Sequence, residues 1–383
     1  MGLKRADRSP TSGSVRARAP RLPISVLTGF LGSGKTTLLR RLLGDPRLRD
    51  AAVIVNELGE VGIDHLVLRE VGEDVVVLPS GCLCCTVRQD LVTTLRSLYM
   101  RRRRRSIPRF DRILVETTGL ADPAPILQTL CKDALIAERF RLDGTIATID
   151  AVNAMDQLDR HRESVKQAAM ADRLVITKTD IADAACSATL KARLAAINPS
   201  ATQLIAIRGE IDAGHLLDAG LYNAVTRSVD VERWLQADVH GRGRPYAGVY
   251  PNALTHDDRI RTFCLSSNEP IDWEPFAAAM QALMARHGDG MLRVKGILEV
   301  VGEAMPLAVN GVQHVFYPPQ HLARWPAGAR RSRLVFITFG IEREQVIALL
   351  RGVFEPVDMI SSERAGVLPT NSDFGESTHG RSA

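Results

Sequence analysis

Residues 29–37 read GFLGSGKTT. The stretch matches the pattern G-x-x-x-x-G-K-[ST], whose fixed positions are filled by Gly29, Gly34, Lys35 and Thr36. An apolar run precedes it and leucines at helical spacing follow it, so the sequence predicts a strand, a loop and a helix. In such a loop, backbone N–H groups face phosphate oxygens and the helix N-terminus adds its dipole. The stretch therefore predicts that the chain binds a nucleotide.

The residues of this stretch have separate roles in phosphate binding. Lys35 can reach the β- and γ-phosphates, and the hydroxyl of Thr36 can coordinate Mg²⁺, which makes magnesium an expected cofactor. We expect the nucleotide to contact the following residues of the stretch: Gly29, Gly32, Ser33, Gly34, Lys35, Thr36 and Thr37.

The chain has 383 residues, of which 45% are apolar, so it is long enough for two domains with buried cores. No apolar run approaches the length of a membrane span, and the N-terminal residues lack the apolar core of a signal peptide. We therefore expect a cytoplasmic protein with no membrane partner.

The net charge of +5 is concentrated at the N-terminus. Residues 1–22 contain six Lys or Arg and one Asp, and we expect this basic leader and the tail, residues 356–383, to be disordered. The run Arg101–Arg105 is expected to be a solvated connection between a helix and a strand rather than a patch for an anionic partner. These counts imply no basic face on the folded part, so we predict no nucleic-acid partner.

Strand-like apolar runs alternate with helical patterns across residues 23–235. After the first strand, the expected strands are 52–55, 75–78, 112–115, 145–149, 174–177 and 203–207, and the expected helices include 90–99, 124–130 and 188–197. Most of the runs are continuously apolar, as in strands that are covered on both faces. The pattern predicts an α/β domain with a doubly wound, mostly parallel sheet.

The alternation changes in the C-terminal part of the chain. Residues 236–258 are predicted to be a linker, and residues 259–355 a smaller α+β domain of the ferredoxin-like kind. Its expected strands are 261–265, 292–300, 307–316 and 334–339, and its expected helices are 273–286 and 343–353.

Two acidic segments are placed to meet Mg²⁺ and the γ-phosphate. Residues 113–123 read ILVETTGLADP, a buried strand that ends at Glu116, which could hold Mg²⁺ directly or through water. The N–H of Gly119 could then meet the γ-phosphate, as in the second switch of a P-loop GTPase. Residues 56–66 lie where the first switch would be, and one of their acids, with Glu57 first, could approach Mg²⁺; a solvated loop is the alternative.

Residues 174–180, LVITKTD, indicate which base is bound. Asp180 can accept hydrogen bonds from the N1–H and N2–H₂ of guanine, while the stem of Lys178 covers the base. Adenine lacks this pair of donors, so the sequence predicts GTP. Thr177 stands where the usual N-K-x-D motif has Asn, so the motif is complete except at its first position.

Three cysteines, Cys82, Cys84 and Cys85, fall within four positions of the stretch SGCLCCTVRQDL, between a predicted strand and a helix. Thiols at this spacing can converge on one soft divalent cation, with a fourth ligand from elsewhere in the chain, from water or from a client protein. Thiolates favour Zn²⁺, then Co²⁺, over Mg²⁺; a redox pair or inert buried cysteines are the alternatives. The other cysteines, Cys131, Cys186 and Cys264, are expected to be small buried residues.

These motifs occur in one order that resembles the CobW-type metallochaperone GTPases, which are related to the hydrogenase and urease maturation GTPases. The resemblance covers about residues 23–355 and extends to the C-terminal segments LRVKGIL, NGVQHVFYPP and RSRLVFI. It implies GTP hydrolysis coupled to the loading or release of a transition metal, with zinc first and cobalt or iron after it. It also implies that Cys82, Cys84 and Cys85 are the family's CxCC metal motif. Many relatives carry a His-rich stretch before the C-terminal domain, which this sequence lacks.

Two other functions fit part of the pattern. A P-loop kinase acting on a small molecule would leave the clustered cysteines and Asp180 without a role. A metal buffer or sensor would use the nucleotide to regulate metal affinity without turnover. The sequence names neither the metalloprotein client nor the oligomeric state, and it is compatible with a homo-oligomer.

Overall fold

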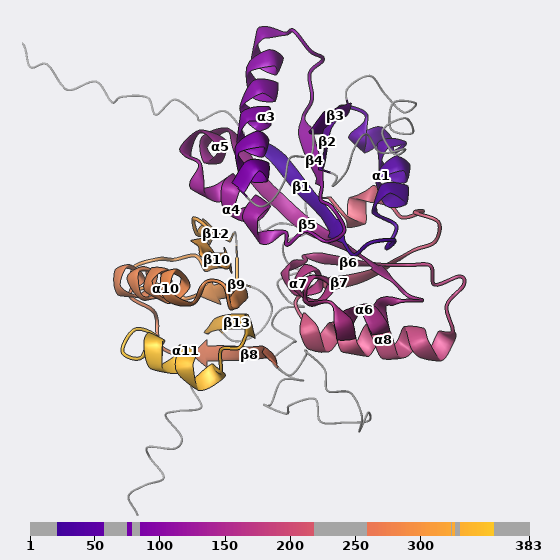
Figure 1. Ribbon diagram of the computed structural model, residues 1–383. Coiled ribbons are helices and arrows are strands. Elements are labelled where there is room, and N and C mark those ends of the chain that lie inside the picture. Colours follow the sequence, from indigo (N-terminus) through magenta and orange to yellow (C-terminus); the bar gives the residue numbers. More distant parts are fainter. Residues whose placement is uncertain are drawn as a thin grey trace, which may run out of the picture.

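The computed structural model of the chain describes residues 21–56, 75–78, 85–217, 259–322, 324–325 and 330–355. They form two sheets, the first built from the N-terminal half of the chain and the second from the C-terminal part (Figure 1). Residues 1–20, 218–258 and 356–383 lie outside the described residues, and they include the predicted linker (236–258), the predicted tail (356–383) and all of the predicted leader (1–22) except Arg21 and Leu22. Within the described part, no helix is long and apolar enough to cross a membrane.

The first sheet has seven strands in the order β3-β2-β4-β1-β5-β6-β7, and all neighbouring strands are parallel. The strands are β1 (Leu22–Gly29), β2 (Ala51–Asn56), β3 (Val75–Leu78), β4 (Arg112–Glu116), β5 (Phe140–Asp150), β6 (Arg173–Thr177) and β7 (Thr202–Ala206). The α-helices are α1 (Lys35–Leu43), α3 (Cys85–Arg104), α4 (Ala124–Lys132), α5 (Ala134–Arg139), α6 (Ala154–Arg160), α7 (Arg162–Met170) and α8 (Ala184–Ile197). The short 3₁₀ helices are η1 (Pro46–Leu48) and η2 (Ala213–His215). The predicted doubly wound parallel sheet is confirmed.

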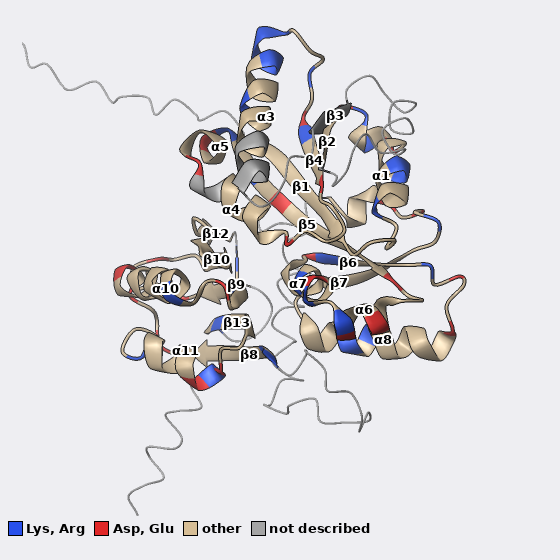
Figure 2. Cartoon of the chain, viewed as in Figure 1, with Lys and Arg blue, Asp and Glu red and all other residues tan. Residues whose placement is uncertain are grey.

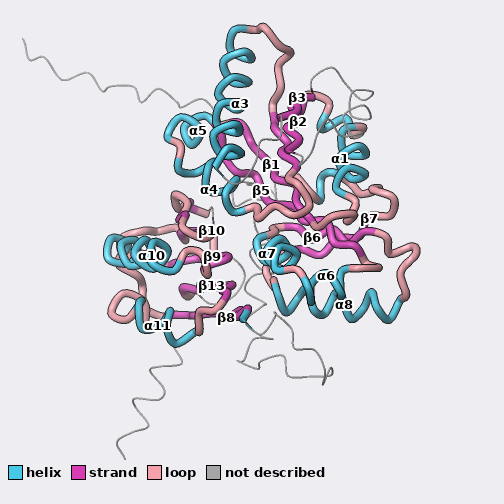
Figure 3. The backbone as a smooth tube through the Cα atoms, in the orientation of Figure 1, coloured by secondary structure: helices cyan, strands magenta, loops and turns pink. Residues whose placement is uncertain are grey.

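Alternating side chains of these strands enter two different cores. In β1, Ile24 and Val26 pack with α3, α4 and α7, whereas Leu27 packs with α1 and residues 213–217 on the opposite face. Figure 3 shows helices on both sides of the sheet. Because both faces are covered, the strands are apolar at nearly every position, and this is why their sequence shows continuous runs instead of alternation.

The second sheet is antiparallel, with the order β11-β10-β9-β13-β8 and with β12 paired to β10. Its strands are β8 (Ile260–Ser267), β9 (Met291–Leu298), β10 (Leu307–Val312), β11 (Val315–Phe316), β12 (Gln320–His321) and β13 (Ser332–Phe339), and its helices are α10 (Trp273–His287) and α11 (Arg343–Leu350). The prediction of a smaller α+β unit is confirmed. Helix α11 follows the last strand, β13, whereas in the β-α-β-β-α-β order of the ferredoxin-like motif the second helix comes before the last strand.

Both faces of the second sheet are also buried. One face packs on α10 and α11, around Phe276 and Phe336. The other face contributes Leu292, Val312 and Ile337 to the core of the first sheet, through contacts of β8, β9 and β10 with α8, α7 and α4. Helices α4, α7 and α8 therefore form a layer between the two sheets.

Two local predictions are wrong. Residues 307–316 do not form one strand, because Gln313 adopts a φ of 48°, a left-handed conformation that turns the chain between β10 and β11. The run Arg101–Arg105 is mostly exposed, as predicted, but it is not a connection, since α3 continues to Arg104 and its last turn contains four arginines. Figure 2 shows Lys and Arg gathered at the tip of this helix. Cations there face the partial negative charge of the helix C-terminus, which favours continuing the helix.

Candidate nucleotide site

The loop between β1 and α1 has the backbone of a phosphate-binding loop. Gly29, Gly32 and Gly34 adopt φ values of 140°, 71° and 94°, which residues other than glycine rarely adopt. A Cβ atom on Gly29 would also collide with the side chains of Thr148 and Ser33. Glycine is therefore required at this position both by its conformation and by the close approach of β5.

The side chains of the loop are held in fixed positions. Nζ of Lys35 donates to the carbonyl oxygens of Gly29 at 3.0 Å and Phe30 at 3.1 Å, so its ammonium group lies across the loop. Oγ of Ser33 is buried and lies 2.6 Å from Oγ1 of Thr148, so the side chain of Ser33 faces the sheet. Thr36 and Thr37 lie in the first turn of α1, where backbone N–H groups have no partner inside a helix. Lys35 and these N–H groups together form a site of positive potential.

Thr36 and Glu116 meet at the ends of neighbouring strands. Glu116 is the last residue of β4 and lies opposite Leu27 of β1, and it is only 5% exposed. The hydroxyl of Thr36 donates to Oε1 of Glu116 at 3.1 Å. These are hard oxygen ligands of the kind that Mg²⁺ uses, so the residues present fit this cation.

The loop that follows Glu116 packs directly on the phosphate-binding loop. A Cβ atom on Gly119 would lie 2.7 Å from the backbone nitrogen of Leu31, which explains the glycine. The hydroxyl of Thr117 donates to Oγ1 of Thr28 at 2.9 Å, and the N–H of Ala121 donates to the carbonyl of Thr118 at 3.1 Å, closing a turn. Gly119 is thus placed beside the phosphate-binding loop.

Thr177, which stands where the usual N-K-x-D motif has Asn, contacts the phosphate-binding loop directly. Its hydroxyl donates to the carbonyl oxygens of Ser33 at 2.8 Å and Ile149 at 3.2 Å. Its side chain also faces the position where a Cβ atom of Gly34 would be. Thr177 therefore ties the end of β6 to β5 and to the loop that precedes α1.

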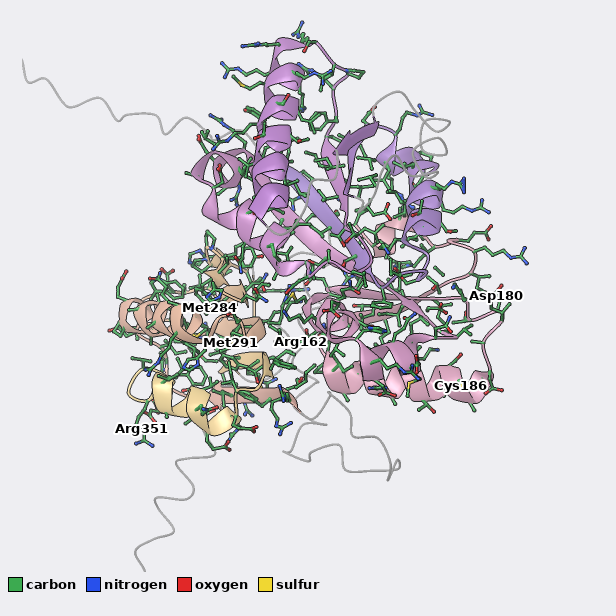
Figure 4. All side chains as sticks on the ribbon, viewed as in Figure 1. Arg162, Asp180, Cys186, Met284, Met291 and Arg351 are labelled. Carbon is green, nitrogen blue, oxygen red and sulfur yellow. The ribbon has the colours of Figure 1, made fainter. Side chains whose placement is uncertain are left out.

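Lys178 and Asp180 follow at the end of β6. Lys178 has a φ of 58°, and its Nζ donates to Oδ2 of Asp150 at 2.7 Å. Asp180 is partly exposed, with Nε of Arg208 3.9 Å from its Oδ2. Figure 4 shows Asp180 on the side of the molecule away from helices α10 and α11.

Asp150, the last residue of β5, holds Lys178 in place. Its other partners are the backbone N–H of Val152 and the side-chain amide of Asn153, both at 2.9 Å. Burial alone would raise the pKa of Asp150, but the hydrogen bonds from Lys178, Asn153 and Val152 together lower it. Asp150 is thus a charged carboxylate at neutral pH, and it fixes the ammonium group of Lys178.

Several residues of this site were missed by the sequence analysis. Thr148 and Asp150 could have been found, because β5 ends in an acid as β4 does. Gln167, on α7, and Arg208, after β7, give no signal in the sequence, because only the packing of α7 and the turn after β7 brings them to this edge.

The predicted cysteine ligands and Glu57 lie wholly or partly outside the described residues. Glu57, Cys82 and Cys84 lie outside the described residues, and of Cys85 only the backbone is described, at the start of α3. Among the described residues, no group of three or more His, Cys, Asp or Glu could hold a metal ion. The prediction of burial is wrong for Cys186, which is exposed near the start of α8, and Cys264 is only partly buried. Cys186 points to solvent because α8 packs through Leu190, Leu194 and Ile197 instead.

Comparison with known proteins places this arrangement in a family. Residues 23–205 match the CobW/HypB/UreG nucleotide-binding domain, and residues 260–354 match the cobalamin synthesis protein cobW C-terminal domain. The chain is 32% identical to the zinc chaperone YjiA of Escherichia coli over 332 residues, which cover 87% of this chain and 98% of YjiA. It is 34% identical to the zinc chaperone CobW of Pseudomonas aeruginosa over 375 residues, which cover 86% of this chain and 91% of that protein.

The solved structure of Zn(II)-bound YjiA GTPase from E. coli has a TM-score of 0.60 and 28% identity to this chain, covering 88% of this chain and 100% of YjiA. The similarity thus includes the phosphate-binding loop and the C-terminal sheet in one protein. The chain belongs to the CobW/HypB/UreG family of nucleotide-binding proteins and carries the CobW C-terminal domain.

Proposed function

We propose that this chain is a GTP-hydrolysing metallochaperone that binds zinc and delivers it to a client metalloprotein. The observation that carries the proposal is the hydrogen bond between Thr36 and Glu116, which joins the first turn of α1 to the acidic end of β4. A carboxylate and a hydroxyl beside a phosphate-binding loop are the ligands that a nucleotide-bound Mg²⁺ requires. Relatives over most of the chain are named zinc chaperones, which supports metal delivery as the purpose of turnover.

Each residue of the site has a role in the proposed hydrolysis. Lys35 binds the β- and γ-phosphates, and the N–H groups of the loop from Gly29 to Thr37 surround the phosphate oxygens. Thr36 and Glu116 would hold Mg²⁺, with Glu57 as a further candidate ligand. The bound ion supplies charge neutralisation on the β- and γ-phosphates. Gly119 presents its N–H to the γ-phosphate from a loop that already packs against Leu31.

Asp180 is proposed to select guanine. We expect wild type to bind GTP more tightly than ATP, and Asp180→Asn to reduce this preference about 10- to 100-fold, because the acceptor pair for N1–H and N2–H₂ is lost. Competition of GTP and ATP against a fluorescent GDP analogue measures both affinities. A matched control is Asp183→Asn, since Asp183 caps α8 three residues later and should not affect base choice. Equal affinities of the wild type for GTP and ATP would contradict the assignment.

The metal cargo is proposed to bind through Cys82, Cys84 and Cys85. Zinc has the strongest support, because thiolates bind it well and the relatives bind or carry zinc by name; cobalt and iron are the next candidates. Cys85 is the first residue of α3, which packs on the same sheet as the phosphate-binding loop, so metal and γ-phosphate can affect the same loops. If GTP tightens metal binding, metal must tighten GTP binding by the same factor.

This coupling can be tested by metal titration. We expect zinc affinity, measured against a competing chelator, to differ about 5- to 150-fold between a GTP analogue and GDP. Cys84→Ala and Cys85→Ala should lose tight zinc binding and any effect of zinc on turnover, while GTP affinity stays unchanged. Cys186→Ala is the matched control, because Cys186 is exposed on α8.

The outcomes of the titration also separate the alternatives. Equal zinc affinities in the two nucleotide states would contradict the switch and support a metal buffer. Transfer of phosphate to a metabolite instead of release of free phosphate would support a P-loop kinase. A client would then be sought among proteins captured by the zinc-loaded, GTP-analogue-bound chain, which also shows whether the chain binds a second copy of itself.

A further inference from the structure

Helix α7 contacts the phosphate-binding loop, the loop of Gly119 and the C-terminal sheet. At its N-terminus, the centroids of the His161 ring and the ring of Phe30, in the phosphate-binding loop, are 4.5 Å apart. The next residue, Arg162, stacks on Phe339 of β13 at 4.0 Å, between the two sheets (Figure 4). At its C-terminus, the carbonyl of Met170 accepts a hydrogen bond from Arg293 of β9 at 3.0 Å. Helix α7 therefore contacts the phosphate-binding loop of the first sheet as well as strands β9 and β13 of the second sheet.

Gln167, in the middle of α7, is bonded to the loop that carries Gly119. Its side chain is 1% exposed, and its Nε2 donates to the carbonyl oxygens of Gly119 and Ala121, both at 3.1 Å. Both N–H groups of one buried amide are thus used on one short loop. The neighbouring Lys166 pairs with Asp122 of the same loop at 2.5 Å. Two consecutive residues of α7 hold this loop.

We propose that Gln167 is a positioning residue for GTP hydrolysis, which fixes the loop of Gly119 against the phosphate-binding loop. The inference rests on the proposed function, because Gly119 matters only if a γ-phosphate is bound. By bonding two carbonyl oxygens, Gln167 fixes the Gly119–Leu120 and Ala121–Asp122 peptide planes, and so restrains the short loop whose Gly119 N–H faces the γ-phosphate in the proposed function. Donors aimed in advance at the developing charge act without reorganisation during the reaction.

The chemistry of the side chain explains why glutamine suits this place. Two buried carbonyl oxygens need two donors, and a side-chain amide supplies both from one nitrogen. An ionised glutamate would present only acceptors to them, a protonated glutamate a single donor, and a methionine of similar length no donor. Either substitution removes at least one of the two hydrogen bonds and loosens the loop, whereas the core contacts of α7 remain.

The same helix connects the loop with the C-terminal sheet. Gln167 and Met170 are three residues apart, so the loop contact and the contact to Arg293 are one helical turn apart. A shift of the loop when the γ-phosphate binds or leaves should therefore change the protection of backbone amides in β9. Hydrogen exchange of β9 in the presence of a GTP analogue and of GDP measures this effect.

The test compares Gln167 with a matched glutamine in the same layer. Gln128 of α4 is also buried, at 6% exposed, but its Nε2 donates to Oε1 of Gln313, between β10 and β11 of the C-terminal sheet, at 3.0 Å. We expect Gln167→Met and Gln167→Glu to lower kcat for GTP hydrolysis about 10- to 100-fold while the affinity for GDP stays within twofold of wild type. Gln128→Met should keep the wild-type kcat even if it lowers the thermal midpoint of unfolding as much as the Gln167 variants do.

Each result decides the proposal. A wild-type kcat in both Gln167 variants, or an equal loss of kcat in Gln128→Met, would overturn the positioning role while leaving GTP hydrolysis intact. Failure of the wild type to bind or hydrolyse GTP would overturn the proposed function and this inference together. If Gln167→Met does not fold, Gln167→Glu, which keeps the shape of the side chain, provides the measurement; GDP affinity reports whether the site has formed.

Discussion

Lys35→Ala should lower kcat for GTP hydrolysis by about 100- to 1,000-fold, the usual effect of removing one strong donor to a transition state. The ammonium group of Lys35 lies across the phosphate-binding loop, held by the carbonyl oxygens of Gly29 and Phe30. From there it is the cation best placed to balance charge that develops on the γ-phosphate. Release of inorganic phosphate at saturating GTP measures the effect, and titration with GTP measures the accompanying loss of affinity.

A matched control lies on the same helix. Arg40 is an exposed cation in the last turn of α1, so Arg40→Ala removes a charge without touching the phosphate-binding loop. Its kcat should stay within about twofold of wild type, since exposed charges act weakly across water. Phosphate release by Lys35→Ala at the wild-type rate would remove the basis for a nucleotide site in this loop.

Asp172→Asn should lower the free energy of unfolding by about 3 to 5 kcal/mol, the cost of breaking a buried ion pair by removing one partner. The carboxylate of Asp172 lies between the two sheets, where its Oδ1 accepts from Nη2 of Arg293 at 2.5 Å and from Nζ of Lys295 at 2.7 Å. Its Oδ2 accepts from the backbone N–H of Thr145 at 2.9 Å. The variant leaves two buried cations of β9 without their anion. Chemical denaturation at pH 7 measures the loss.

Two further variants test this explanation. Asp159→Asn breaks a partly exposed pair, between Asp159 and Arg193 of α8, and should cost less than about 1 kcal/mol. Adding Lys295→Met to Asp172→Asn should recover part of the stability, because it removes one of the two buried cations that have lost the Asp172 carboxylate. A loss below about 1 kcal/mol in Asp172→Asn itself would show that the pair does not hold the sheets together.

The contribution of Asp172 should also depend on pH. Burial alone would raise its pKa, but the charges of Arg293 and Lys295 outweigh burial and lower the pKa to about 2. A carboxyl group with a lowered pKa stabilises the fold above its unfolded pKa of about 4, and the contribution is lost as the pH falls through the folded value. The difference in stability between wild type and Asp172→Asn should therefore be constant from pH 7 to about pH 5 and shrink towards pH 2.

The ion pairs of Asp172 with Arg293 and Lys295 join the first sheet to the C-terminal sheet. Arg293 and Lys295 belong to a strand, β9, whose other residues are almost all apolar, and both are fully buried there. Two cations within an apolar strand are costly unless an anion meets them, and Asp172, the residue just before β6, supplies it. β6 ends at Thr177, which bonds the backbone of Ser33, so this one strand connects the contact with the C-terminal sheet to the phosphate-binding loop.

The sequence by itself determined the parts of this protein whose chemistry depends on neighbours along the chain. The phosphate-binding loop follows from glycines that must adopt positive φ between a strand and a helix, and the parallel sheet follows from strands that are apolar on both faces. Glu116 and Asp180 could be placed at the nucleotide edge because the C-terminal ends of parallel strands meet there.

Only the tertiary structure decided what depends on residues far apart in the chain. Thr177 bonds the backbone of Ser33, and Asp172 pairs with Arg293, over separations of 144 and 121 residues. No periodicity or motif encodes such pairs, because a local pattern does not say which distant residue a side chain will meet. Gln167 is the clearest case: in the sequence it is one more polar residue of an amphipathic helix, and only the packing of α7 brings its amide to the carbonyl groups of Gly119 and Ala121.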